Sequence, residues 1–207
     1  MPVCDLKKGG YRFGAVIPAA GLSSRMGAFK PLLPYLDSTV IGSAVSAVLP
    51  YADRVTVVLG YRAEEVKKEL FDRFGDRVKT VLNPDYQSSD MLRSVQLGLE
   101  SLGDCDGFFL LPGDMPAIDP STFETLLSAF DGDKKVIYPV WNGRRGHPPL
   151  IHASLIPEIL GYRREGGLRA ILEAYPAEHI LLNDNGIMAD LDTPEDYAEI
   201  IKNHPMG

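Results

Sequence analysis

The sequence predicts an α/β fold, a three-layer αβα sandwich around a mostly parallel sheet. Short apolar runs rich in β-branched residues, such as 13–17 and 54–59, alternate with segments whose apolar residues recur at helical spacing, such as 63–74. Strands that alternate with helices in this way form parallel units with helices on both faces of the sheet. The 207 residues suit one domain, and no linker, repeat or low-complexity segment divides them.

Each element follows from a local pattern. Residues 1–12 are expected to form a loose tail. Strands are expected where short apolar runs end at turn residues, at 13–17, 54–59, 78–82, 107–111, 136–140, 148–151 and 179–182. Helices are expected at 40–49, 63–74, 92–102, 121–130, 154–160, 167–174 and from 194 onward. Because Pro139 has no N–H to donate, we expect the strand 136–140 at an edge or end of the sheet.

The charge and the cysteine content exclude several classes of protein. A net charge of −7 disfavours nucleic-acid binding, which requires a basic face. The two cysteines, Cys4 and Cys105, give neither a disulfide framework nor a zinc spacing. No stretch approaches the roughly 18–20 apolar residues of a membrane span, and the N-terminus lacks a signal core. We therefore expect a cytoplasmic protein that binds a small ligand, and neither nucleic acid nor membrane.

The loop after the first strand is predicted to bind an anion. It combines small residues, which let backbone N–H groups approach a phosphate, with two cations that suit a triphosphate. The small residues are Ala19, Ala20, Gly21, Ser23 and Gly27, and the cations are Arg25 and Lys30. The spacing fits neither the P-loop nor the dinucleotide-binding fingerprint. The alternative is a surface loop that happens to contain glycine and two basic residues.

This loop resembles the signature A-A-G-x-S-x-R-M-G-x-x-K of nucleotidyltransferases, in particular the molybdenum cofactor cytidylyltransferases. The resemblance implies a Rossmann-like fold of the GT-A type, with a mixed but mostly parallel sheet. It also implies that the loop wraps a nucleoside triphosphate while Arg25 and Lys30 contact its phosphates. In the family, the relatives that use adenine or guanine nucleotides tend to vary the Ala-Ala-Gly, so the resemblance at 19–21 implies CTP rather than ATP or GTP.

Three carboxylates are candidate metal ligands. Asp114 directly follows the apolar strand 107–111, and Asp190 and Asp192 precede the last helix. If they meet at one edge of the sheet, they can hold Mg²⁺ against phosphate oxygens. The alternative is that each only caps a turn or a helix. The segments around them resemble the family's L-x-x-G-D-x-P and D-x-D-T-P-E-D, which implies metal binding by Asp114 first, Asp192 second and Asp190 third.

The segment that begins at Asn83 resembles the family's N-P-x-x-x-x-G-M-x-x-S, which borders the base and the ribose. The resemblance implies that Asn83 and Ser94 bind the nucleotide. Asp90 stands where the family has Gly, which adds a side chain and a negative charge. For Ser88 and Ser89, capping of the following helix is the alternative role.

Two further segments are candidates for the acceptor site. The first, with Arg145 and His147, resembles the R-G-H-P that faces the acceptor in cytidylyltransferases, and a solvated surface loop is the alternative. The second, 166–169, is similar to a family segment G-x-x-G-x-R, which implies that Arg169 takes the acceptor's phosphate at a helix start. Trp141 and Asn142 are further candidates to line the acceptor pocket, and packing in the core is the alternative for Trp141.

Together these features predict transfer of a nucleoside monophosphate, CMP from CTP, to a phosphorylated small-molecule acceptor. The resemblance implies molybdopterin as acceptor, Mg²⁺ as cofactor, and Arg25, Lys30 and Asp114 as catalytic residues. A molybdoenzyme would be the maturation partner. Two alternatives stay open: a nucleotidyltransferase acting on a sugar 1-phosphate, and a non-catalytic nucleotide-binding regulator. An NAD-dependent oxidoreductase is disfavoured because the glycine fingerprint is missing.

Overall fold

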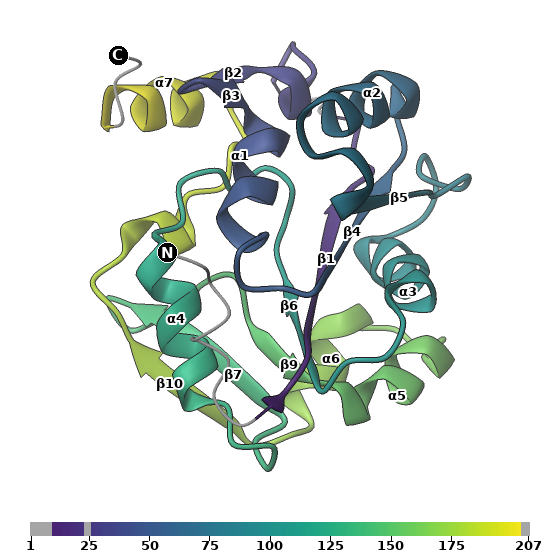
Figure 1. The fold of residues 1–207 in the computed structure, drawn as a ribbon, viewed down its shortest axis with the longest axis vertical. Helices are drawn as coiled ribbons and strands as arrows, with labels where there is room; N and C mark the ends of the chain where they lie inside the picture. Colours follow the sequence, from purple (N-terminus) through teal and green to yellow (C-terminus); the bar gives the residue numbers. More distant parts are fainter. Residues whose placement is uncertain (1–9, 23–25, 204–207) are drawn as a thin grey trace.

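The computed structural model describes residues 10–22 and 26–203 (Figure 1). Within these residues the main sheet has the strand order β10-β7-β9-β6-β1-β4-β5, with β8 paired to β7. Strands β5, β4, β1 and β6 are parallel, β9 runs antiparallel to both β6 and β7, and β10 is parallel to β7. The strands are β1 (Phe13–Ala19), β4 (Arg54–Leu59), β5 (Val78–Leu82), β6 (Gly107–Leu110), β7 (Val136–Trp141), β8 (Arg144–Arg145), β9 (Leu150–His152) and β10 (Ala177–Leu181).

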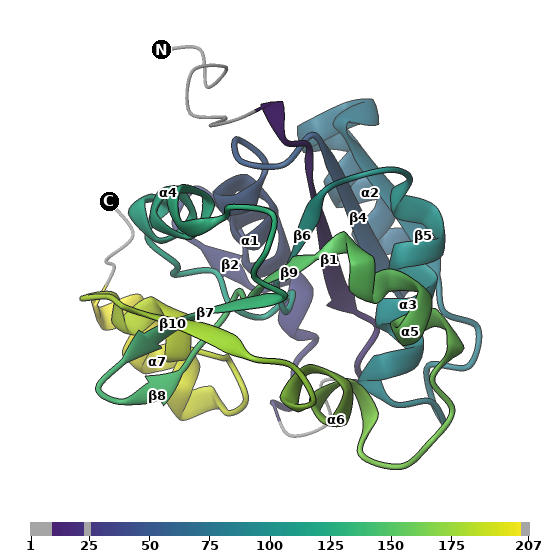
Figure 2. The ribbon, with the colours of Figure 1, turned by 90° about the horizontal axis from the view of Figure 1, so that it is seen from below.

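Helices cover both faces of this sheet, which confirms the predicted α/β sandwich (Figures 1 and 2). One face carries α1 (Val40–Val48), α2 (Ala63–Phe74) and α4 (Pro120–Ala129). The other carries α3 (Met91–Leu102), α5 (Ile156–Gly161) and α6 (Gly167–Glu173). Helix α7 (Pro194–Asn203) lies beside the small hairpin of β2 (Pro34–Tyr35) and β3 (Ser38–Thr39), where Tyr197 donates a hydrogen bond to the carbonyl oxygen of Pro34 at 2.6 Å. None of the described helices is long and apolar enough to cross a membrane.

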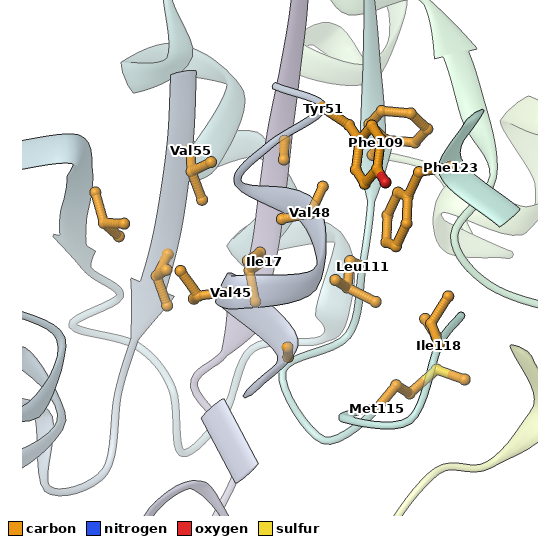
Figure 3. Packing of buried hydrophobic residues seen from close by; sticks show 14 of the residues in the cluster. Ile17, Val45, Val48, Tyr51, Val55, Phe109, Leu111, Met115, Ile118 and Phe123 are labelled. Atoms are coloured by element: carbon orange, nitrogen blue, oxygen red, sulfur yellow. The ribbon is translucent and has the colours of Figure 1, made fainter. Parts of the chain in front are cut away.

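The core follows from the alternation of side chains along the strands. In β1, Ile17 packs in the layer of α1 and α4, whereas its neighbour Val16 packs against α3. Figure 3 shows Val45 and Val48 of α1 close to Ile17 in the first of these layers. Two apolar layers of this kind fix the sheet between the helices, and the carboxyl ends of β1, β4, β5 and β6 therefore share one edge.

Side-chain caps define where the helices near that edge begin. Thr39 accepts a hydrogen bond from the Gly42 amide at the start of α1, and Asp90 accepts one from the Arg93 amide at the start of α3. At α7 the Asp196 amide donates to Thr193 Oγ1, and the Thr193 amide donates to Asp196 Oδ2. These caps explain where α3 and α7 begin, and the cap of α3 is Asp90 rather than Ser88 or Ser89. The helix bounds lie within one or two residues of those expected.

The prediction that β7 lies at an edge is wrong. Strand β7 pairs with β10 on one side and with β9 and β8 on the other. Pro139 lies between the residues that pair with β9 and those that pair with β8, and its carbonyl oxygen accepts a hydrogen bond from the Gly146 amide at 2.8 Å. The missing N–H therefore falls where the ladder changes partner, and an interior strand tolerates proline there.

The expected loose tail, residues 1–12, is also corrected in part. Residues 1–9 lie outside the described residues, but Tyr11 is held in place. Its ring contacts Phe130 edge to face with centroids 5.1 Å apart, and its hydroxyl donates to the carbonyl oxygen of Asp131. The short strands β2, β3 and β8 were not predicted, because two residues are too few to show a periodic pattern.

Candidate functional site

A cleft of about 260 Å³ opens at the carboxyl edge of the sheet, where ligands of open α/β folds bind. Its walls come from the ends of β1, β5 and β6, from the turn after residue 29, and from the start of α3. It is lined by Pro18, Ala19, Ala20, Gly21, Lys30, Pro31, Asn83, Tyr86, Ser89, Asp90, Met91, Ser94, Pro112, Gly113 and Asp114.

Two glycines allow the loops around the cleft to approach one another. A Cβ on Gly60 would lie 2.4 Å from the carbonyl oxygen of Ala20 and 2.6 Å from Cβ of Tyr86. A Cβ on Gly113 would lie 2.9 Å from Cβ of Ala19, and the Gly113 amide donates to the carbonyl oxygen of Pro18 at 3.0 Å. The loop after β1 is therefore packed between the ends of β4 and β6, with its backbone facing the cleft.

Lys30 is the buried cation of the site. The residue is only 8% exposed, and it begins the 3₁₀ turn Lys30–Leu32. Its Nζ lies 2.7 Å from Asp192 Oδ1 and 3.7 Å from Asp114 Oδ2. A buried ammonium group without such partners would be strongly destabilising. The structure thus brings together one predicted cation and two predicted carboxylates from distant parts of the chain.

The backbone holds the two carboxylates in register. The Leu191 amide donates to the carbonyl oxygen of Asp114 at 3.2 Å, which joins the segment before α7 to the loop after β6. The Asp192 amide donates to Asp196 Oδ2 at 3.1 Å, so the capping group of α7 also orients Asp192. The backbone that carries each carboxylate is therefore held by hydrogen bonds that do not involve Lys30.

The carboxyl group of Asp114 has a perturbed acidity. Burial raises the pKa of Asp114, and this effect outweighs the opposing attraction of Lys30. The charges of Asp190 and Asp192 raise the pKa of Asp114 further. A cation bound beside Asp114 would stabilise the ionised carboxylate and so offset these effects. The raised pKa therefore favours cation binding at Asp114.

The donor set fits a magnesium ion that is bound together with a substrate phosphate. Mg²⁺ is usually held by one or two carboxylates together with phosphate oxygens and water. Asp114 and Asp192 can provide the two carboxylates. No three His, Cys, Asp or Glu side chains converge into a preformed metal site within residues 10–22 and 26–203. Asp190 is exposed and acts on Asp114 through its charge. No ion pair with Lys30 is found for it among the described residues, so of the three predicted ligands its position supports metal binding least.

A buried amide organises the wall formed by the end of β5 and the start of α3. Asn83 is 1% exposed, and its Nδ2 donates to Ser89 Oγ at 2.9 Å and to Ser94 Oγ at 3.0 Å. Its Oδ1 accepts a hydrogen bond from the Asp85 amide at 3.0 Å. Both N–H donors of Asn83 are thus used within the protein, so Asn83 positions the two serines around the cleft.

The three residues predicted to contact the acceptor lie outside the cleft lining, as far as the described residues define it. Arg145 Nε donates to His179 Nε2 at 2.8 Å, and its guanidinium lies 4.7 Å from the ring centre of Tyr138. Arg169 is exposed and pairs with Glu173 at 2.8 Å, and its charge also acts on Tyr138. Arg145 and Arg169 therefore border a common surface on the side of α6.

His147 is partly buried, whereas Arg145 and Arg169 are exposed. Its Nδ1 lies 3.4 Å from the carbonyl oxygen of Leu110, and burial lowers the pKa of His147 despite the nearby charge of Asp190. The imidazole is therefore neutral at pH 7, and it is not the solvated surface residue of the alternative interpretation.

The remaining sequence predictions divide into three groups. Ala19, Ala20 and Gly21 line the cleft. Gly27 lies outside its lining and has φ +65°, a value that favours glycine. Ser23 and Arg25 lie outside the described residues.

The sequence interpretation missed three residues of the site and its surroundings. Tyr86 and Met91 line the cleft although no role was assigned to them, and His179 holds Arg145. Tyr86 and Met91 belong to a segment that had already been singled out, so its position after β5 was a usable signal. His179 gave no signal, because its contact with Arg145 joins residues 34 positions apart.

A cleft of this kind, with a small-residue loop, a buried lysine and two carboxylates at the carboxyl ends of parallel strands, is typical of α/β proteins that bind phosphorylated ligands. Residues 15–180 match the MobA-like NTP transferase domain. The chain belongs to this family of nucleotidyltransferases.

Similar proteins agree with this assignment. The molybdenum cofactor cytidylyltransferase of Escherichia coli is 29% identical over 184 residues, which are 88% of this chain and 92% of that protein. A probable molybdenum cofactor guanylyltransferase of Bacillus cereus is 24% identical and covers 69% of this chain and 68% of its own length. A solved nucleotidyl transferase from Methanothermobacter thermautotrophicus superposes with a TM-score of 0.79 at 26% identity, over 94% of this chain and 98% of the other.

The raised pKa of Asp114 makes a prediction for stability. As pH rises above about 3.9, the usual pKa of Asp, Asp114 loses its proton in the unfolded chain before it does so in the folded protein. Ionised Asp114 therefore reduces the free energy of unfolding at neutral pH. Asp114→Asn removes this penalty while Lys30 keeps Asp192 as its closer partner. In metal-free buffer we expect a higher Tm than wild type at pH 7 and a difference that shrinks toward pH 3.

Asp119→Asn is the matched control, because its expected sign is opposite. Hydrogen bonds from Ser121 lower the pKa of Asp119, so ionised Asp119 stabilises the fold above pH 4. This variant should have a Tm equal to or below that of wild type at pH 7. An Asp114→Asn variant that is less stable than wild type at pH 7 would contradict the account of Asp114.

Proposed function

We propose that this protein transfers CMP from CTP to the phosphate of a small acceptor, molybdopterin, and releases pyrophosphate. The observation that carries the proposal is the buried Lys30 between Asp114 and Asp192, beside the backbone of residues 19–21. This arrangement suits a triphosphate that binds with a divalent cation. The choice of CTP and molybdopterin is supported by the similarity to the cytidylyltransferase of E. coli and by the sequence Ala19-Ala20-Gly21.

The chemistry requires positioning and charge neutralisation. An acceptor phosphate oxygen, already ionised at neutral pH, attacks the α-phosphorus of CTP, and the bond to the β-phosphate oxygen breaks as pyrophosphate leaves. Lys30 neutralises charge that develops on the α-phosphate, and Arg25 holds the β- and γ-phosphates. Mg²⁺ bound by Asp114 and Asp192 would supply further charge neutralisation on the phosphate oxygens. No covalent enzyme intermediate is needed.

The rest of the cleft serves the nucleoside. Backbone groups of residues 19–21 approach the nucleotide closely, because Gly60 and Gly113 leave room for the loop. Ser94, oriented by Asn83, offers its hydroxyl to the nucleotide. On the acceptor side, Arg145 and Arg169 supply cations for an anionic group, and His147 contributes a neutral imidazole near Asp190.

Pyrophosphate release by the purified protein tests the function. CTP, GTP, ATP and UTP are each combined with molybdopterin or with a panel of sugar 1-phosphates, with Mg²⁺ or with EDTA. We expect release with CTP, molybdopterin and Mg²⁺ together, and none with EDTA.

Other outcomes of this assay favour the alternatives. Release with a sugar phosphate alone would identify the sugar nucleotidyltransferase. Binding of CTP without release for any acceptor would identify the regulator. Wild-type turnover in EDTA would contradict the metal assignment.

Loss of Lys30 should be the most damaging single change. Lys30→Ala removes a preorganised cation from the reacting phosphate, and we expect turnover to fall by about 10²–10³. Lys68→Ala is the control, because its side chain is 77% exposed and lies on α2, away from the cleft. Tm and circular dichroism establish that both variants fold. A folded Lys30→Ala variant with wild-type kcat would remove Lys30 from this role.

A further inference from the structure

The cleft is bordered by charges of opposite sign. Lys30 borders it from the side of Asp114 and Asp192, whereas Asp90 borders it from the side of α3 and α6. Helices α3 and α6 pack against each other (Figure 2), and a Cβ on Gly167 at the start of α6 would lie 3.9 Å from Asp90 Oδ2. A triphosphate is repelled by a carboxylate, and Asp90 forms no ion pair with a cation in residues 10–22 or 26–203. Asp90 therefore disfavours phosphates on its side of the cleft.

The two carboxylate oxygens of Asp90 have different surroundings. Oδ1 accepts the Arg93 amide hydrogen at 3.1 Å and caps α3. Oδ2 accepts no hydrogen bond from any described residue. It faces the start of α6, where Gly167 has no side chain to cover it, since a Cβ there would lie 3.9 Å from Oδ2. An exposed carboxylate oxygen is thus left open at the cleft.

The buried amide of Asn83, in the same wall as Asp90, is already fully engaged. Asn83 donates both amide hydrogens to Ser89 and Ser94, and its oxygen accepts from the Asp85 amide. A hydroxyl group of a ligand that approaches this wall therefore finds in Asp90 Oδ2 an acceptor with full negative charge. Charge-assisted hydrogen bonds of this kind are about twice as strong as neutral ones.

We propose that Asp90 is a specificity-determining residue that accepts a hydrogen bond from a ribose hydroxyl of the bound nucleotide. Ribose is the neutral, donor-bearing part that all four ribonucleoside triphosphates share, and carboxylates pair with ribose hydroxyls in other nucleotide sites. The same charge sets the direction of the nucleotide, with the phosphates at Lys30 and the nucleoside at Asp90. This inference rests on the proposed nucleotide-binding function.

Nucleotide affinity tests the proposal without knowledge of the acceptor. Asp90→Ser keeps a good N-cap for α3 but has one oxygen, which the Arg93 amide uses. Dissociation constants for CTP, 2′-deoxy-CTP, 3′-deoxy-CTP and UTP are measured by calorimetry with Mg²⁺. We expect wild type to bind CTP about 10- to 100-fold more tightly than one of the deoxynucleotides, and this ratio to fall to about 1–3 in Asp90→Ser.

Two further variants keep the test specific. Asp90→Asn retains the cap and the shape of the side chain and should lose most of the ratio, because the charge is gone. Asp85→Ser removes an equal charge from a residue that lies five positions before Asp90 and is not part of the cleft lining. This variant should leave the ratio unchanged. Tm values establish that each variant is folded.

The outcomes separate this inference from the proposed function. A folded Asp90→Ser variant that retains the wild-type ratio of CTP to deoxynucleotide affinity overturns the inference, while CTP binding itself leaves the proposed function standing. Loss of the preference for CTP over UTP with an unchanged ribose ratio also overturns it, because Asp90 then contacts the amino group of the base. Wild-type protein that binds no nucleoside triphosphate contradicts both.

Discussion

The contact of the Lys30 ammonium with the carboxylates of Asp114 and Asp192 is the interaction on which the site depends. It joins the turn after the first loop, the end of β6 and the segment before α7, which are separated by up to 162 residues in the sequence. A buried ammonium is tolerated only if its partners are in place, so this contact requires the sheet edge, the loop after β1 and the cap of α7 to form together. The fold and the site therefore specify one another.

The same group of charges also imposes a cost on the empty protein. Burial and two neighbouring carboxylates raise the pKa of Asp114, so ionised Asp114 lowers the free energy of unfolding at neutral pH. A polyanion that enters together with a divalent cation reverses this balance, because each added charge meets a fixed partner. Strain of this electrostatic kind is common where a protein is built to bind a charged ligand.

Much of this arrangement follows from the sequence. The periodic segments gave strands and helices near their observed bounds, and strand ends in a parallel sheet share an edge, which placed Lys30 and Asp114 together. Contacts without a local signal were missed. Pro139 suggested an edge strand because it has no N–H to donate. The hydrogen bond from Gly146 to its carbonyl oxygen was missed, because Gly146 lies in a hairpin that no local pattern predicts. The pairing of Arg145 with His179 likewise depends on tertiary packing that spacing alone does not encode.

A crystal structure with a non-hydrolysable CTP analogue and Mg²⁺ tests the central claim most directly. The account predicts the triphosphate against Lys30 and the backbone of residues 19–21, a metal ion on Asp114 and Asp192, and the ribose directed toward Asp90. A nucleotide bound in the opposite direction, or at a place where it contacts neither Lys30 nor the two carboxylates, would contradict it.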